Sequence, residues 1–329
     1  MQSSIWLPPA AAFVISFFTS MGGISGAFLL LPLQMSVLGI TSPAVSATNL
    51  VFNLVATPGG VYRYAREKRI IWPLALLVVA GTTPGMVLGG FVRLSYLSDV
   101  KRFKIFVGLV LLWLGIRLAL DIWKSRNTAS APSKAAEWHS RTAEFNWRRL
   151  VFEFRHQRYE CKPTGVFVLS LIVGLIGGIY GIGGASIISP FLVAIYGLPV
   201  YTVAGATLLG TFVTSLAGVS FYQIVAPVYQ ASGMTVAPNW SLGLSFGVGG
   251  MAGMYLGARV QRFIPATYLK ILLALVIFGV SAYYIAAVTR NNVRGGPLAV
   301  PSLHGLFRDV QDVATTVVGD LKLQELINR

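Results

Sequence analysis

Two glycine-rich segments interrupt apolar stretches of this chain, and their residue types suit the binding of an anion. One of them, Gly174–Gly184, holds six glycines in eleven residues, and the other begins at Gly22 with GGISGAF. A helix that starts after such a break has free N–H groups and the positive end of its dipole. Glycine has no Cβ, so an anion can approach those N–H groups closely. We therefore expect two helix N-termini, at Gly26–Ala27 and Gly184–Ala185, to face one anion site near the middle of a membrane.

Uncharged polar side chains lie near both segments. Asn49 and Asn53 are four residues apart and share a helix face, as do Thr207 and Thr211. Hydroxyl and amide donors suit an oxyanion, although each such side chain can equally join two helices. The candidate substrate-binding residues are Gly23, Ser25, Gly26, Thr48, Asn49, Asn53, Gly181, Gly183, Gly184, Ser186, Thr207 and Thr211. Glycines elsewhere predict close helix packing instead: Gly85, Gly89, Gly90, Gly249, Gly250, Gly253 and Gly257.

Charged groups that could do other chemistry are missing from the apolar segments. The eleven acidic residues and three histidines fall in loops, in the linker, in the tail or at segment ends. Cation carriers and proton relays usually place an ionisable residue inside the membrane, and acid–base or metal catalysis needs a cluster of them. Cys161 is the only cysteine, which excludes an intrachain disulfide and a cysteine metal site. The sequence thus favours an anionic substrate and predicts no catalytic residue, no metal and no cofactor.

The composition is that of a polytopic membrane protein. Hydrophobic residues make up 55% and charged residues 11% of the chain, and the mean hydropathy is +0.69. The net charge of +15 lies mainly between apolar segments, where cytoplasmic loops concentrate Lys and Arg. We therefore attribute it to membrane topology and contact with anionic lipid, not to nucleic-acid binding. No basic residue precedes Arg63, so we expect the first apolar run to be retained and not cleaved as a signal peptide.

Three sequence matches in the same order divide the chain into two homologous halves. GGISGAFLLLPL matches YGIGGASIISPF, AVSATNL matches VAGATLL, and GMVLGGFV matches GMYLGARV. This order indicates a tandem duplication in an all-α membrane protein. The divisions we expect are a first transmembrane repeat (1–122), a basic cytoplasmic or interfacial linker (123–163), a second transmembrane repeat (164–289) and a tail with an amphipathic helix (290–329).

Two arrangements of the halves are open. The apolar pieces 7–20 and 24–38 each reach only about 21 Å as helices, against a hydrocarbon core of about 30 Å. If each such pair forms one Gly-broken span, the repeats are parallel. If each pair forms a re-entrant hairpin or two tilted short spans, the repeats are inverted. Inversion is favoured because it places most basic residues on one side; the exceptions are Arg93, Lys101, Arg102 and Lys104.

The linker contains EFNWRRLVFEFRHQRYE, residues 144–160, which mixes aromatic with basic residues. We expect either an interfacial helix or a small hairpin held against lipid headgroups. No catalytic arrangement of residues is visible in it.

In its motifs the chain resembles the sulfite exporter TauE/SafE family. The resemblance rests on GGISGAFLLLP, AVSATNL, GIYGIGGASIISP, AGATLL and the two GM-x-LG stretches, and covers roughly residues 10–288. It implies a multi-pass carrier of the bacterial inner (plasma) membrane for a small sulfur anion, such as sulfite, thiosulfate or an organosulfonate like sulfoacetate. The long linker and the tail depart from the family's compact form.

The function we expect is a secondary transporter that exports a small sulfur oxyanion. The alternatives are an anion channel of the same fold, a transporter of a non-sulfur anion, a membrane-embedded enzyme, and a scaffold that binds partners through the linker and tail. The partners expected are a small anionic substrate and membrane lipid, with no nucleic acid. A second copy of the chain, forming a homodimer, is a further candidate partner.

Overall fold

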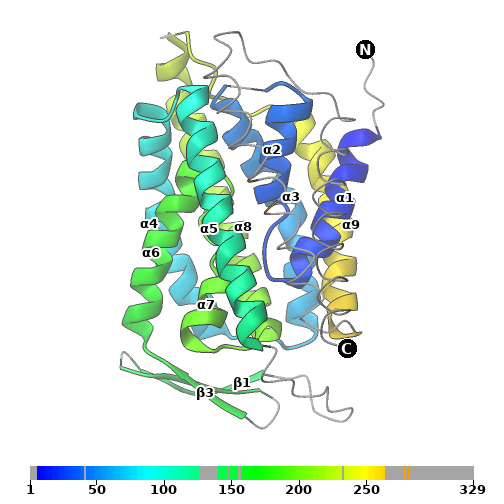
Figure 1. Ribbon diagram of the computed structural model, residues 1–329, viewed down its shortest axis with the longest axis vertical. Coiled ribbons are helices and arrows are strands. Elements are labelled where there is room, and N and C mark those ends of the chain that lie inside the picture. The colour runs from blue at the N-terminus through cyan, green and yellow to red at the C-terminus, as the bar shows by residue number, and fades with distance from the viewer. Residues whose placement is uncertain are drawn as a thin grey trace, which may run out of the picture.

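The computed structural model describes residues 6–40, 42–125, 140–146, 148–154, 157–231 and 233–263, together with Phe278 and Ser281. These residues form a bundle of helices with a small β-sheet at one end (Figure 1). The helices are α1 (Leu7–Met21), α2 (Ala27–Val37), α3 (Ala44–Arg66), α4 (Trp72–Ser95), α5 (Val100–Ser125), α6 (Pro163–Tyr180), α7 (Ser189–Tyr196), α8 (Val200–Ala231) and α9 (Trp240–Val260). A 3₁₀ turn, Gln261–Phe263, follows α9. The predicted apolar segment 268–288, apart from Phe278 and Ser281, and the tail lie outside the described residues.

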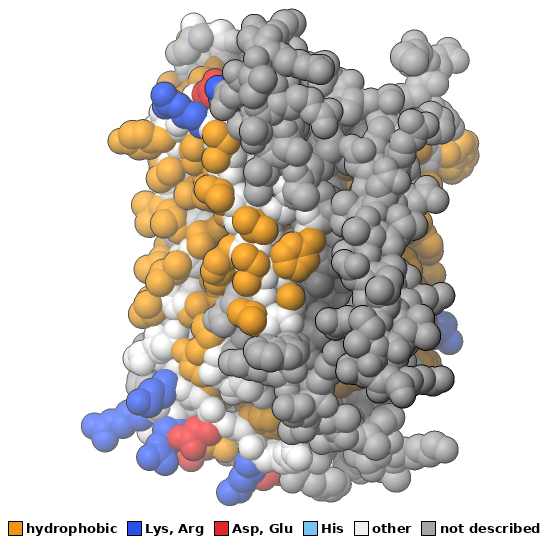
Figure 2. Space-filling model, in the orientation of Figure 1, with side chains coloured by type: hydrophobic (Ala, Val, Ile, Leu, Met, Phe, Trp, Pro, Cys, Tyr) orange, Lys and Arg blue, Asp and Glu red, His pale blue; other side chains and the backbone are white. Residues whose placement is uncertain are grey.

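Three of these helices, α4, α6 and α8, are long and apolar enough to cross a membrane. Proline occupies the first turn of α1, α4, α6 and α7, where its missing N–H leaves no bond unmade. On the face shown in Figure 2, apolar side chains cover the flank of the bundle and charged side chains gather at its two ends. This distribution matches a protein whose flank contacts lipid and whose ends contact water.

Glycine seams join α4 to α6 and α9 to α1. A Cβ added at Gly81, Gly85 or Gly89 of α4 would lie under 3.0 Å from a backbone oxygen of α6, at residues 167, 171 and 175 in turn. Gly249, Gly253 and Gly257 of α9 meet the carbonyls of residues 9, 13 and 17 of α1 in the same way. The numbers of the contacting residues rise along both helices of each seam, so the two helices of each pair run parallel. The predicted packing role of Gly85, Gly89, Gly249, Gly253 and Gly257 is confirmed.

Helices α3 and α8 occupy the middle of the bundle and run antiparallel. A Cβ at Gly60 of α3 would meet Leu208, and one at Gly218 of α8 would meet Leu50, so the contacts advance along one helix as they recede along the other. Helix α3 also packs on α9, and α8 packs on α4. Helix α4 of the first half therefore packs on α6 and α8 of the second half, and α9 of the second half packs on α1 and α3 of the first.

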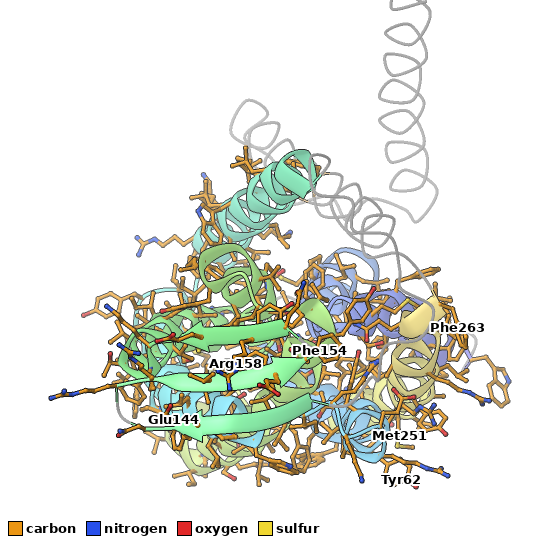
Figure 3. The ribbon with its side chains drawn as sticks, turned by 90° about the horizontal axis from the view of Figure 1, so that it is seen from below. Tyr62, Glu144, Phe154, Arg158, Met251 and Phe263 are labelled. Carbon is orange, nitrogen blue, oxygen red and sulfur yellow. The ribbon has the colours of Figure 1, made fainter. Side chains whose placement is uncertain are left out.

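The linker folds as a three-stranded antiparallel sheet of β1 (Ser140–Phe145), β2 (Leu150–Phe154) and β3 (Gln157–Cys161). In β2, Leu150, Phe152 and Phe154 are buried and alternate with more exposed residues, the period of a strand with one covered face. From below, the strands lie across the ends of the helices (Figure 3). The all-α expectation is therefore wrong for the linker, and of its two predicted forms the interfacial helix is excluded for the described residues 140–146, 148–154 and 157–161.

Candidate functional site

Three polar residues on one face of α3 bind three consecutive carbonyl groups of the second glycine segment. The side chains of Ser46, Asn49 and Asn53 donate to the carbonyl oxygens of residues 180, 181 and 182, at 3.5, 3.1 and 2.7 Å. Spacings of three and four residues place the three side chains on one side of the helix. Helix α6 ends at Tyr180, where its last carbonyls have no intrahelical partner. Helix α3 supplies the missing donors.

The same asparagines also hold the first glycine segment. The Ser25 hydroxyl donates to Asn53 Oδ1, and Asn49 Nδ2 donates to the Ala27 carbonyl at 2.9 Å. The chain between α1 and α2 and the chain between α6 and α7 thus meet at one face of α3. Two segments that are far apart in the sequence are joined by two amide side chains.

Gly183 lies where several polar side chains converge. Its φ is +80°, a conformation that favours glycine, and a Cβ there would lie 2.7 Å from Ser215 Oγ and 3.3 Å from Asn53 Nδ2. Ser186 Oγ would be 3.4 Å away. The Ser215 hydroxyl is buried and makes no hydrogen bond with the residues that the structure describes. We call Ser25, Asn49, Asn53, Gly183, Ser186 and Ser215 the crossing cluster.

The backbone beside Gly183 offers further donors. Within the described ranges, the N–H groups of Gly183, Gly184 and Ala185 donate no hydrogen bond. The next residues form tight turns, in which Ser186 N–H donates to the Gly183 carbonyl at 3.1 Å. Three consecutive N–H groups are therefore free, and a free hydroxyl lies beside the first of them, at Gly183.

The crossing cluster is neutral and sealed from solvent. Its side chains are fully buried. The ion pairs found in the described part of the chain lie at Glu67 and in the sheet. No group of three His, Cys, Asp or Glu residues that could hold a metal occurs in the same part. The site can offer dipoles and neutral donors to a ligand.

Comparison with known proteins decides the family. The family model described as sulfite exporter TauE/SafE matches residues 9–284. The chain belongs to the sulfite exporter TauE/SafE family. A probable membrane transporter protein of Xylella fastidiosa is 24% identical over 275 residues, covering 83% of this chain and 91% of that protein. The probable membrane transporter protein YunE of Bacillus subtilis is 22% identical over 187 residues, which cover 55% of this chain and 64% of YunE. No solved structure matches the chain.

The chain is thus a membrane transporter of the TauE/SafE family with several membrane-spanning helices. The names of its relatives carry no substrate beyond the family description. What this TauE/SafE chain binds has to be argued from its own residues.

The two predicted helix starts fare differently in this TauE/SafE chain. Helix α2 begins at Ala27, as predicted, and its first N–H donates to Ser25 Oγ at 3.2 Å. Helix α7 begins only at Ser189, so a helix start at Gly184–Ala185 is wrong. The Ser186 and Ile188 N–H groups donate to the carbonyls three residues earlier, those of Gly183 and Ala185, which makes turns in place of α-helix.

The other predicted glycines are sites of close packing. Gly23 has a φ of +68°, and a Cβ there would lie 2.7 Å from Ala204 Cα. Gly26 faces Ser16 Oγ and Gly184 faces the Thr82 carbonyl, each at 2.7 Å from the Cβ position. Gly181, with a φ of +79°, is pressed against Ser46. These four glycines permit the two segments to pack, and the crossing cluster lies between them.

Three predicted threonines lie outside the crossing cluster. Thr207 Oγ1 donates to the Gly23 carbonyl at 2.9 Å and so helps to fix the first segment. Thr211 donates to the Thr207 carbonyl of the preceding turn at 2.9 Å. Thr48 donates to the Ala44 carbonyl and accepts from Asn239 N–H at 2.9 Å, toward the beginning of α9.

Sequence reasoning missed Ser46 and Ser215. Ser46 lies three residues before Asn49, and Ser215 lies four residues after Thr211. Both therefore continue a face that the asparagine and threonine spacings had already marked. Extending each face by one turn would have found them.

Proposed function

We propose that this protein is a secondary transporter that exports a small sulfur-containing oxyanion, sulfite or an organosulfonate such as sulfoacetate, across the bacterial inner membrane. The observation that carries the proposal is the crossing cluster: two chain breaks meet there, beside free N–H groups and a free hydroxyl, with no carboxylate. The family supplies transport and the sulfur anion as the class of cargo.

An oxyanion fits the donors of the crossing cluster. The N–H groups of residues 183–185 are free, and the Ser215 hydroxyl points at the same glycine. A nest of successive N–H groups in a turn binds anionic oxygen, and it binds more strongly where water is excluded. Glycine at position 183 has no Cβ, and one there would lie 2.7 Å from Ser215 Oγ. We assign anion binding to this nest and to Ser215, with Asn53 fixing its geometry.

We infer that the two halves are inverted repeats whose breaks are re-entrant. The seam of α4 on α6 has the same glycine spacing as the seam of α9 on α1, and the corresponding helices α3 and α8 are antiparallel. Helices α1 and α2 together hold too few residues for two straight spans. Inverted repeats with sites at discontinuous helices are a common plan of secondary transporters.

Alternating exposure of the crossing cluster is expected from its burial. A site without solvent access can load an anion only if the packed helices move relative to one another. The rigid seams α4–α6 and α1–α9 define two units that could rock about the α3–α8 contact. An inside-negative potential drives anion export by about 2.3 kcal/mol per charge per 100 mV, so export needs no coupled ion.

Flux measurements in proteoliposomes test this function. Purified protein should carry sulfite or sulfoacetate out of loaded vesicles, faster when the interior is negative. The rate should saturate with concentration and show counterflow, which a channel would not. Taurine, a zwitterion, and protein-free vesicles serve as controls. Absence of flux for every sulfur oxyanion tried would refute the proposal.

A further inference from the structure

Helix α4 carries a buried arginine in its last turn. Arg93 is fully buried, and none of its three guanidinium nitrogens makes a hydrogen bond with the described residues. Its guanidinium lies over the Phe103 ring of α5, 3.6 Å from the ring centroid. The ring and the C-terminal end of the helix dipole both favour a cation there. Neither, however, uses the in-plane N–H donors of the guanidinium.

A buried hydroxyl lies close to Arg93. Tyr222 of α8 is fully buried, and its hydroxyl lies within hydrogen-bonding reach of the Ser46 side chain. Phe221, the residue before Tyr222, lies against Gly90 of α4, three residues before Arg93, so the Tyr222 hydroxyl and the Arg93 guanidinium lie in one neighbourhood and interact electrostatically. Buried polar groups are usually paired, and a buried charge nearly always is. A guanidinium fork and a hydroxyl at one place suit an oxyanion, which accepts from both.

The other half of the molecule provides an internal comparison. In the match of GMVLGGFV with GMYLGARV, the residue after the motif is Arg93 in α4 and Gln261 at the end of α9. The Gln261 side chain is saturated: its Oε1 accepts from Tyr64 Oη at 2.9 Å and from Arg69 at 2.6 Å, and its amide nitrogen donates to a backbone carbonyl. A neutral side chain thus suffices for packing at this position. The charge at Arg93 calls for another explanation.

The position of Arg93 relates it to the crossing cluster. Ser46, beside Tyr222, begins the polar face of α3 that continues through Asn49 to Asn53. Arg93 lies near the end of α4 that is remote from the sheet, because α4 runs parallel to α6 and α6 starts next to β3. A polar row on α3 therefore leads from the crossing cluster toward Arg93.

We propose that Arg93 and Tyr222 form a second binding site for a small oxyanion, where the exported anion stops between the crossing cluster and the membrane side opposite the sheet. That this anion contains sulfur and moves outward rests on the proposed function. The binding of an oxyanion to Arg93 does not depend on that function.

Thermal unfolding of the purified full-length protein, with sulfite and sulfate as probes, tests this site. In a Gly183→Ala background, which blocks the crossing cluster, an anion concentration near ten times Kd should still raise the unfolding temperature by about 2–4 °C. Adding Arg93→Gln, which copies Gln261, should remove that rise. Arg93→Lys should keep part of it, because lysine retains the charge without the fork. Arg69→Gln is the matched control at the other end and should leave the rise unchanged.

The outcomes separate the possible roles. If sulfite or sulfate still raises the unfolding temperature of the Arg93→Gln protein, the proposal is overturned. If that protein is also less stable without anion, Arg93 has a packing role only. If Gly183→Ala does not purify as folded protein, Ser215→Val replaces it as the blocking variant. An Arg93-dependent rise in a protein that carries no sulfur anion would refute the proposed function while supporting this site.

Discussion

At the scale of residues, the crossing cluster shows how few groups bring two distant segments together. Asn49 and Asn53 each bind both glycine segments, so these hydrogen bonds of their side-chain amides are made within the protein. The donors left for a ligand are those that no side chain of α3 reaches: the N–H groups of residues 183–185 and the Ser215 hydroxyl. In the proposed anion site, asparagine therefore sets the geometry, and glycine and serine supply the groups that would face the anion.

Gly183→Ala should abolish transport, whereas Gly197→Ala should not. Both glycines have positive φ, +80° and +65°, so either alanine costs about 1–2 kcal/mol of backbone strain. Only at position 183 does the new methyl collide with polar groups; at position 197 nothing lies within 4 Å. Flux in proteoliposomes and unfolding temperature, measured side by side, check this pair. Equal flux in the two variants would show that the space at Gly183 has no part in transport.

Part of the site could be predicted at this scale. The four-residue spacing of Asn49 and Asn53 predicts a shared polar face, which the structure shows, and the glycine count predicts close backbone approach. Ser215 could not be singled out, because serine in a membrane helix is commonplace and only its distance from Gly183 gives it meaning. The burial of Arg93 was also hidden, because α4 continues to Ser95, beyond the end of the apolar run.

At the scale of elements, the glycine seams set the separation of the helices. Along α4 and α9 the seam glycines recur every four residues, and each lies against a carbonyl of the partner helix. Such spacing lets backbones approach and is typical of membrane helices, which have little hydrophobic driving force for association. These helices could be predicted from apolar runs. The sheet could not, since its strands are short and its sequence equally suits an interfacial helix.

Gly85→Leu and Gly253→Leu should each destabilise the protein by about 1–3 kcal/mol or more, because the side chain would enter the partner backbone. Two neighbouring alanines provide matched controls: Ala80 and Ala252 are exposed on the same two helices, so their replacement by leucine should be nearly neutral. Thermal unfolding in detergent measures the differences. If Gly85→Leu and Ala80→Leu unfold at the same temperature, α4 and α6 do not pack as closely as this contact requires.

At the scale of the whole molecule, basic side chains gather at the end that carries the sheet. The parallel seams bring the ends of α3 and α9, with Arg63, Arg66 and Arg259, to the same end as the start of α6. An excess of Lys and Arg marks the cytoplasmic side. Arg93, now buried, no longer counts against that assignment.

Cysteine labelling in whole cells should therefore place the sheet inside and the α8–α9 connection outside. Arg158→Cys, on exposed β3, should react only after the inner membrane is opened, and Ala237→Cys should react with an impermeant maleimide from outside. The native Cys161 should stay silent at neutral pH, because burial, with a smaller effect of Glu160, raises the pKa of its thiol to about 11. The reactive thiolate would appear only as the pH nears that value. Labelling of both sites from one side would contradict the assignment.

The exchange of helices between the halves also constrains how the protein is made. Helix α1 leaves the ribosome before the other described helices, yet its glycine-seam partner α9 is the last described helix of the chain. At translation rates of about 5–20 residues per second, α1 waits on the order of tens of seconds in the bilayer with that face uncovered. Helix α6, by contrast, finds α4 already inserted. Nascent chains stalled before α9 should thus hold a finished α4–α6 pair and an incomplete α1, which makes the first helix the part most exposed to membrane quality-control proteases during biogenesis.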